Sequence, residues 1–117
     1  MHELSLCQNL IDQLTTLTRQ HQAVGVARVE LRVGQLSGVE PALLETAFGL
    51  ARPGTVASSA ELVTDLIPPH ILCQDCGMTA IVEPNDLRCP TCSGSHTELV
   101  DGHELILARV ELLQATD

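Results

Sequence analysis

The chain has 117 residues, a length typical of one domain or of a domain that carries a small inserted module. Hydrophobic residues make up 44% of it, but one Phe is the only aromatic side chain, so a core must be built from Leu, Val, Ile and Ala. The formal net charge is -9, with 15 acidic residues against six arginines and no lysine, which excludes a lysine-dependent phosphate-binding loop and disfavours binding to nucleic acid.

The sequence contains no segment that predicts a membrane or secretory protein. No apolar run approaches the roughly 20 residues that a membrane-spanning helix needs. The first residues also lack the basic and apolar regions of a secretory signal. We therefore expect a cytoplasmic protein with no membrane partner. Five cysteines in a reducing compartment favour metal binding or redox chemistry over structural disulfides.

Residues 4 to 20 are predicted to form an amphipathic helix, because six apolar residues fall on one face at helical spacing. These residues are Leu4, Cys7, Leu10, Ile11, Leu14 and Leu17. Ser5 followed by Gln8 resembles a capping box, which would begin the helix near Leu6 and leave residues 1–3 outside it. Gly25 is the expected stop, and Cys7 is expected to be a small buried core residue.

The segments that follow predict three strands and a second helix. Apolar and charged residues alternate from 24 to 36, as they do in a half-buried strand. Pro41 at a favoured first-turn position and Gly54 after the end predict a helix between them. Residues 60–67 predict a second strand, and residues 103–114 predict a third. The apolar face of that last strand consists of Ile106, Ala108, Val110 and Leu112.

The region 70–98 holds four of the five cysteines but few large apolar residues, so it cannot build much of a hydrophobic core alone. Two prolines at 68–69 break regular structure before it. We therefore predict an α+β fold, a small α/β sandwich in which two helices pack on a three-stranded sheet. Residues 1–69 plus 99–117 form this domain. A four-cysteine, zinc-ribbon-like module of residues 70–98 is inserted before the last strand.

Two C-x₂-C pairs separated by twelve residues predict a metal site formed by Cys73, Cys76, Cys89 and Cys92. Two such turns bring four thiolates to the corners of a tetrahedron, a geometry that suits Zn²⁺. A site with four cysteine ligands leaves no open coordination position, so the ion is expected to stabilise the fold. Gly77 and Gly94 are expected to ease the tight turn after each pair.

Other interpretations of the cysteine pairs are less favoured. Paired turns that end in glycine also resemble rubredoxin, where iron occupies the four thiolates, but no aromatic residue lies between 70 and 98 to pack around an iron. A nucleic-acid-binding zinc ribbon is disfavoured because Arg88 is the only basic side chain there, against four acidic ones. A zinc-braced adaptor that binds another protein remains an alternative.

The first three residues, Met1-His2-Glu3, carry a second set of possible metal ligands. A bulky second residue should prevent removal of Met1, so the free α-amine, the His2 imidazole and the backbone amides between them can form fused chelate rings. Square-planar nitrogen and oxygen ligation favours Ni(II) or Cu(II), and Glu3 could add its carboxylate or its amide nitrogen. A second-position histidine is more often incidental, so these residues alone assign no metal.

Three features in this order resemble the HypA/HybF family of hydrogenase maturation proteins: MHELSL at the N-terminus, RVGQLSGVEPALLETAF at 32–48, and the paired cysteine turns before a last strand. The resemblance covers essentially the whole chain. It implies that His2 is a nickel ligand with Met1 and Glu3 as neighbours in the same site. It also implies that the four paired cysteines bind structural zinc. His96 and Glu40 are open candidates for a further metal ligand.

The resemblance implies a nickel metallochaperone rather than an enzyme. Such a protein binds Ni(II) at its N-terminus and delivers it to the large subunit of [NiFe]-hydrogenase. A HypB-type GTPase is the implied partner, since it would supply a nucleotide step that a chain without lysine cannot perform. The alternative is a zinc-braced protein-interaction adaptor without a nickel site, in which the N-terminal histidine is incidental.

Overall fold

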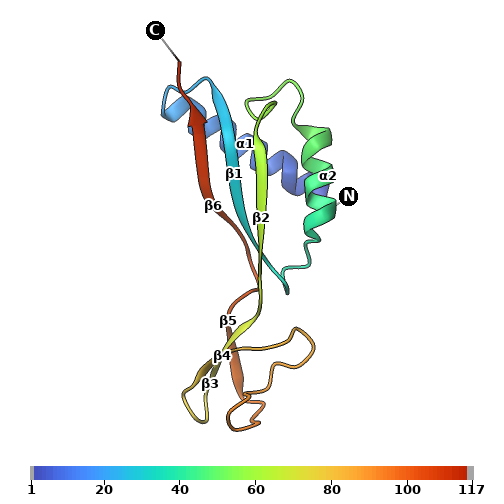
Figure 1. Ribbon diagram of the computed structural model, residues 1–117, viewed down its shortest axis with the longest axis vertical. Helices are drawn as coiled ribbons and strands as arrows, with labels where there is room; N and C mark the ends of the chain where they lie inside the picture. The colour runs from blue at the N-terminus through green and yellow to red at the C-terminus, as the bar shows by residue number, and fades with distance from the viewer. Residues whose placement is uncertain (1, 116–117) are drawn as a thin grey trace. The chain divides into compact units, whose positions relative to one another are not determined.

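The structure, a computed structural model, describes residues 2–115, and at residue 2 it describes the backbone alone. The chain divides into two compact units (Figure 1). The first unit consists of Met1–Leu31, Glu40–Thr64 and Leu107–Asp117, and the second of Arg32–Val39 and Asp65–Ile106. Three of the boundaries between the units therefore fall inside a strand.

Two helices and six strands make up the described part of the chain. In chain order they are α1 (His2–Gln20), β1 (Gly25–Gly34), α2 (Pro41–Ala51), β2 (Glu61–Ile67), β3 (His70–Cys73), β4 (Thr79–Ile81), β5 (Thr97–Asp101) and β6 (Leu105–Leu113). They form two three-stranded sheets with the strand orders β2-β1-β6 and β4-β3-β5. The predicted α+β class with a cysteine module is confirmed. Neither helix is long and apolar enough to cross a membrane.

The core of the first unit is built from α1, β1 and α2. Its buried residues include Cys7, Leu10, Ile11, Leu14, Val26, Val29, Leu31, Leu44, Ala47 and Phe48. The alternation predicted for the first strand is confirmed, because Val29 and Leu31 are buried while Arg28 and Glu30 are partly exposed. Phe48, the only aromatic side chain, is 2% exposed, so aliphatic residues supply the rest of this core.

The first helix begins earlier than the capping box predicts. α1 starts at His2, and Ser5 lies exposed inside the helix instead of capping it. The prediction of a start near Leu6 was therefore wrong. Glutamate and leucine have high helix propensity, which makes the Glu3-Leu4 segment compatible with a first helical turn.

The same helix also ends before the predicted stop at Gly25. Gln22 adopts a left-handed conformation with φ 55°. Its N–H donates to the Arg19 carbonyl (3.2 Å), and the Ala23 N–H donates to the Thr18 carbonyl (2.8 Å). These are the two hydrogen bonds of a Schellman motif, with Gln22 in the position that glycine usually holds.

The remaining long elements agree with the sequence pattern. α2 begins at Pro41, whose fixed φ suits the first turn of a helix, and Glu40 is its N-cap residue. Gly54, with φ 77°, follows its C-terminal end. β2 and β6 lie within the predicted ranges 60–67 and 103–114.

The second unit contains three short strands that the sequence pattern did not predict. β3 pairs antiparallel with both β4 and β5, so that Ile71 lies opposite Ala80 on one side and Leu99 on the other. The buried cluster of this unit is Ile71, Cys73 and Cys89, with Ala80, Val82, Leu87 and Leu99 packed against it. The cluster is small, as the scarcity of large apolar residues in this region suggests.

Backbone hydrogen bonds within the second unit leave no room for a side chain at Gly34. Its N–H donates to the Glu104 carbonyl, and the Leu36 N–H donates to the Gly102 carbonyl, both at 2.9 Å. A Cβ on Gly34 would overlap the Gly102 carbonyl and would lie 2.7 Å from the His103 nitrogen. These obstacles are backbone atoms, which cannot rotate away.

We predict that Gly34→Ala destabilises the protein by about 3 kcal/mol or more, because the added methyl group forces strand backbones apart. Urea unfolding followed by circular dichroism measures the effect. Gly49→Ala is the matched control, since a Cβ at Gly49 meets no atom within 4 Å. In the α2 helix that change should stabilise the protein by about 0.5–1 kcal/mol. Equal unfolding midpoints for the two variants would contradict the prediction.

Candidate functional site

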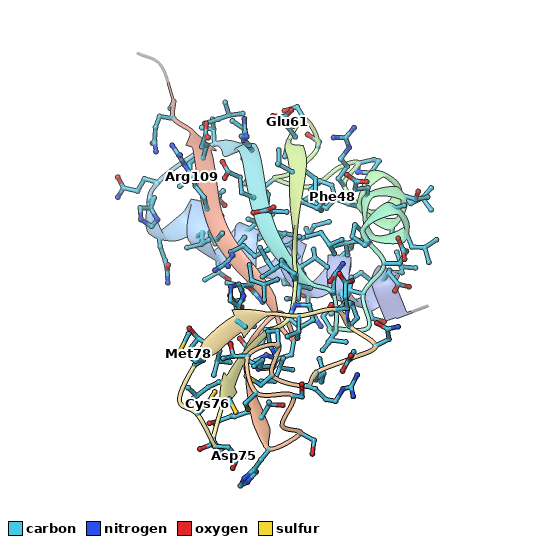
Figure 2. All side chains as sticks on the ribbon, turned by 60° about the horizontal axis from the view of Figure 1, so that its bottom comes forward. Phe48, Glu61, Asp75, Cys76, Met78 and Arg109 are labelled. Carbon is cyan, nitrogen blue, oxygen red and sulfur yellow. The ribbon has the colours of Figure 1, made fainter. Side chains whose placement is uncertain are left out.

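The four paired cysteines come together in the second unit. Cys73 ends β3, Cys76 lies in the turn between β3 and β4, and Cys89 and Cys92 lie in the loop before β5. Their sulfur atoms all lie within 4.8 Å of one another, and Cys76 is labelled in Figure 2. In the part of the chain whose side chains are described, this is the one group of His, Cys, Asp and Glu ligand atoms close enough to hold a metal ion.

The sulfur positions fit a tetrahedral zinc site. Cys73 Sγ lies 3.6 Å from Cys92 Sγ, and Cys76 Sγ lies 3.6 Å from Cys89 Sγ. A tetrahedron with Zn–S bonds of about 2.3 Å has sulfurs about 3.8 Å apart. Each close pair joins one cysteine from each C-x₂-C turn, so both turns face the same central point.

The two cysteine turns share one backbone hydrogen-bond pattern. In each turn the N–H of the first cysteine donates to the carbonyl of the residue five positions later. The carbonyl of the same cysteine accepts a hydrogen bond from the N–H of the residue four positions later. These bonds, of 2.8 to 2.9 Å, join Cys73 to Met78 and Gly77, and Cys89 to Gly94 and Ser93. The sequence C-x₂-C therefore builds the same sulfur-presenting turn twice.

The glycines of the two turns have different roles. Gly77 has φ 76°, as expected for a residue that eases a tight turn. In the second turn the positive φ (61°) belongs to Ser93 instead of Gly94. Gly94 supplies space, because a Cβ there would lie 3.2 Å from Cys92 Sγ and 3.1 Å from Asp75 Oδ2.

Backbone N–H groups favour the thiolate form of these cysteines. The N–H groups of Cys92 and Thr91 donate to the Cys89 sulfur and lower the pKa of that thiol to about 7. The Gly94 N–H likewise lowers the pKa of Cys92, but the Cys73 thiol, desolvation and the other two thiols outweigh it and raise that pKa to about 12. The pKa of one thiol is therefore lowered by backbone N–H groups, while the Cys73 thiol and desolvation favour the protonated form of Cys92.

This arrangement fits a structural Zn²⁺ ion. A divalent cation at the centre would neutralise the charge that opposes ionisation of the remaining thiols, and thiolates are the ligands that zinc accepts in tetrahedral sites. Four cysteine ligands would complete the coordination sphere. The cluster can hold a metal that braces the fold, and it offers no open position for a substrate.

His96 lies near the cysteine cluster but is not part of it. Its Nδ1 atom is 3.5 Å from Asp75 Oδ1, and its side chain is 75% exposed. Its backbone carbonyl accepts the Gln74 N–H at 2.9 Å, which ties the segment before β5 to the first cysteine turn. The described ligand group contains only the four cysteines.

Two of the N-terminal candidates, His2 and Glu3, belong to the first turn of α1. Met1 and the side chain of His2 lie outside the described part of the structure. The backbone of His2 is the first residue of α1, and the Glu3 side chain is partly buried. Glu40 is exposed at the N-cap of α2, where its side chain forms no capping hydrogen bond.

Cys7 is a core residue, as the sequence pattern predicts. It is fully buried, and its Sγ lies 3.5 Å from the Leu44 carbonyl, to which it donates. Burial and, to a smaller extent, the Glu3 carboxylate raise the pKa of this thiol. Cys7 therefore stays protonated between α1 and α2 and belongs to no group of metal ligands in the described part of the chain.

The sequence of the whole chain matches known proteins of one kind. The profile of the family described as "Hydrogenase/urease nickel incorporation, metallochaperone, hypA" matches residues 1–112. The hydrogenase maturation factor HypA of Shewanella oneidensis is 39% identical over 117 residues, which covers 100% of this chain and 99% of the relative. HypA of Aquifex aeolicus is 38% identical over 112 residues, covering 96% and 97%.

Solved structures share the fold. A solution structure of HypA protein has a TM-score of 0.75 and 27% sequence identity, and it covers 98% of both chains. The solution structure of the Ni metallochaperone HypA from Helicobacter pylori has a TM-score of 0.71 and 24% identity, and it covers 97% of this chain and 98% of that one. The latter likeness supports the fold alone.

We predict that Cys73→Ala loses bound zinc and unfolds the cysteine-bearing unit, because the ion substitutes for most of that unit's hydrophobic core. Metal analysis should give less than one zinc per chain. Hydrogen exchange should show loss of protection in β3, β4 and β5 while α1 and α2 stay protected. Cys7→Ala is the control and should keep one zinc per chain. Full zinc occupancy in Cys73→Ala would show that the cluster is not the zinc site.

Proposed function

The chain belongs to the HypA family of nickel-incorporation metallochaperones, and we propose that it binds Ni(II) at its N-terminus and delivers the ion to the large subunit of a [NiFe]-hydrogenase. As a member of this family it is a nickel metallochaperone of hydrogenase maturation, a maturation factor rather than a catalyst. Its cargo must be bound firmly enough to be carried and loosely enough to be released.

The observation that carries the nickel-site proposal is the place of His2 as the first residue of α1. The first N–H groups of an α-helix have no carbonyl acceptor within the helix. The amide nitrogens of His2 and Glu3 can therefore lose their protons and bind a metal without breaking a helical hydrogen bond. Together with the α-amine of Met1 and the His2 imidazole, they supply the nitrogen ligands that Ni(II) accepts in square-planar sites.

The electrostatics of the helix end favour an exchangeable ion over a permanent one. The N-terminus of a helix carries a partial positive charge, which disfavours a bound cation. Deprotonated amides and the Glu3 carboxylate would offset that charge. Because the positive helix end opposes nickel binding and the anionic ligands favour it, the site has a modest affinity for Ni(II). Such an affinity suits an ion that must be passed on by ligand exchange.

The cysteine cluster supports the same division of roles. Four thiolates around one ion leave no vacant position through which a receiving protein could add a ligand. Zinc in that cluster is therefore a poor candidate for cargo. The N-terminal ligands are contiguous in sequence and would need few contacts with the rest of the fold, so a recipient can replace them one at a time.

Two proteins are the proposed partners of the nickel-loaded chain. A HypB-type GTPase would provide nucleotide hydrolysis, which this chain cannot catalyse through a phosphate-binding lysine because it has no lysine. The hydrogenase large subunit would receive the ion. His96 and Glu40 remain proposed sources of an additional nickel ligand.

We predict that His2→Ala binds Ni(II) at least about tenfold more weakly than the wild-type chain, because it loses one of the fused chelate rings. Isothermal titration calorimetry of untagged, zinc-loaded protein measures this affinity. His21→Ala is the matched control. His21 lies just beyond the other end of the same helix, exposed, with its ring Nδ1 3.0 Å from the Leu17 carbonyl. That variant should bind nickel as the wild type does.

Acetylation of the α-amine should weaken nickel binding as His2→Ala does, since it removes the other proposed terminal ligand. Wild-type affinity in both the acetylated chain and His2→Ala would contradict the N-terminal site. A chain that binds no Ni(II) in any form but still binds a hydrogenase maturation protein would favour the adaptor function instead.

A further inference from the structure

The cysteine cluster of the second unit combines two buried cysteines with two exposed ones. Cys73 and Cys89 are each 1% exposed, whereas Cys76 and Cys92 are exposed. The susceptibility of a cysteine to oxidation follows its thiolate character and its exposure. A small dissolved oxidant is therefore expected to react first with Cys76 or Cys92.

Each exposed cysteine lies beside a buried cysteine of the other turn. Cys92 Sγ is 3.6 Å from Cys73 Sγ, and Cys76 Sγ is 3.6 Å from Cys89 Sγ. Each of these two pairs thus joins a sulfur that an oxidant can reach to a sulfur that is protected from it. The other cross-turn arrangement would join the two buried cysteines to each other, and neither member of that pair is open to an oxidant.

Disulfides within each C-x₂-C turn are the remaining arrangement, and they would leave the two turns unlinked. The pairs at 3.6 Å are separated by 19 and 13 positions in the sequence, and the shorter loop lies inside the longer one. Both bonds can therefore form in one chain. Because links across longer loops restrict the unfolded chain more, these two bonds would stabilise the folded unit more than bonds across three positions.

We propose that peroxide oxidises the four cysteines of the second unit to two cross-turn disulfides, Cys73–Cys92 and Cys76–Cys89. In the reduced chain a zinc ion held by the thiolates joins the two turns, and in the oxidised chain the disulfides join them instead. The unit would thus give up its zinc while its two turns stay together. The proposal concerns the zinc site and does not depend on the nickel site.

Each disulfide consumes one molecule of hydrogen peroxide. The thiolate of Cys92 or Cys76 attacks a peroxide oxygen, so that an S–O bond forms, the O–O bond breaks, and the departing hydroxide takes up a proton to become water. The thiolate of Cys73 or Cys89 then attacks the sulfenic acid. An S–S bond forms, the S–O bond breaks, and the second hydroxide also leaves as water. Two electrons pass from the two sulfurs to the two peroxide oxygens.

Peptide mass spectrometry tests the pairing. Arg88 is the only basic residue between the two C-x₂-C turns, so trypsin separates residues 33–88 from residues 89–109. Untagged, zinc-loaded protein is treated with a small excess of hydrogen peroxide, and free thiols are blocked before digestion. The two peptides should be recovered joined by two disulfides. Cleavage before Asp75 and fragmentation between Cys89 and Cys92 then assign each bond.

Zinc release and hydrogen exchange test whether the disulfides replace the ion. A chromophoric chelator should detect one zinc per chain as the four thiols disappear, whereas Cys7, which is 0% exposed, should remain a thiol. The oxidised chain should keep the protection of β3 and β5 against exchange. A chain stripped of zinc under reducing conditions should lose that protection. Cys7→Ala should give the same zinc release and the same linked peptides as the wild type.

Oxidation of the unfolded chain is the matched control for the pairing. A chain stripped of zinc and oxidised in urea has no fixed arrangement of its turns, and closing a short loop costs less entropy than closing a long one. Disulfides should then form mainly within each C-x₂-C turn. The tryptic peptides 33–88 and 89–109 should be recovered separately.

The proposal fails if the folded chain forms its disulfides within the turns or joins Cys73 to Cys89. It also fails if Cys76 and Cys92 are converted to sulfinic acids without disulfides, because the buried thiols would then not react with their neighbours. Loss of protection in β3 and β5 of the oxidised chain would show that the disulfides do not replace zinc. None of these measurements involves nickel, so their failure would leave the N-terminal site untouched.

Discussion

Four cysteine sulfurs within 4.8 Å of one another cannot all ionise unless a cation neutralises them. The second unit depends on this constraint because its buried cluster centres on only Ile71, Cys73 and Cys89. Full burial of one large aliphatic side chain contributes about 1.5–3 kcal/mol, whereas structural zinc contributes about 10–16 kcal/mol in small zinc-binding peptides. A zinc ion held by the four thiolates would therefore be the main stabilising element of this unit, and β3, β4 and β5 form the frame that brings the thiolates together.

Much of the fold could be predicted because its long elements carry strong periodic signals. The alternation around Val29 and Leu31 identified β1, and Pro41 with Gly54 bounded the second helix. The four paired cysteines were identified by spacing alone, and their sulfurs do meet. In each case a local pattern of a few residues identifies the element, although the two cysteine turns meet only because β3 pairs with β4 and β5.

The features that escaped prediction depend on backbone geometry that side-chain types do not specify. Gln22 and Ser93 adopt positive φ where glycine was expected to end a helix or ease a turn, because hydrogen bonds to the surrounding backbone outweigh the cost of that conformation. β3 to β5 are three to five residues long, too short for a periodic signal. The N–H groups of Thr91 and Cys92 that lower the pKa of Cys89 belong to the backbone, so side-chain types alone do not reveal them.

The two proposed metal sites differ in how much of the fold they need, and this difference explains their different roles. The zinc ligands come from two turns that are brought together only when β3 pairs with its neighbours, so release of zinc from the reduced chain must be coupled to unfolding of that unit. The proposed nickel ligands are consecutive in sequence, with His2 as the first residue of α1, so release of nickel would cost only the loss of a local chelate. One chain can thus retain one metal while it exchanges another, because the retained ion is linked to the folding equilibrium and the transferred ion is not.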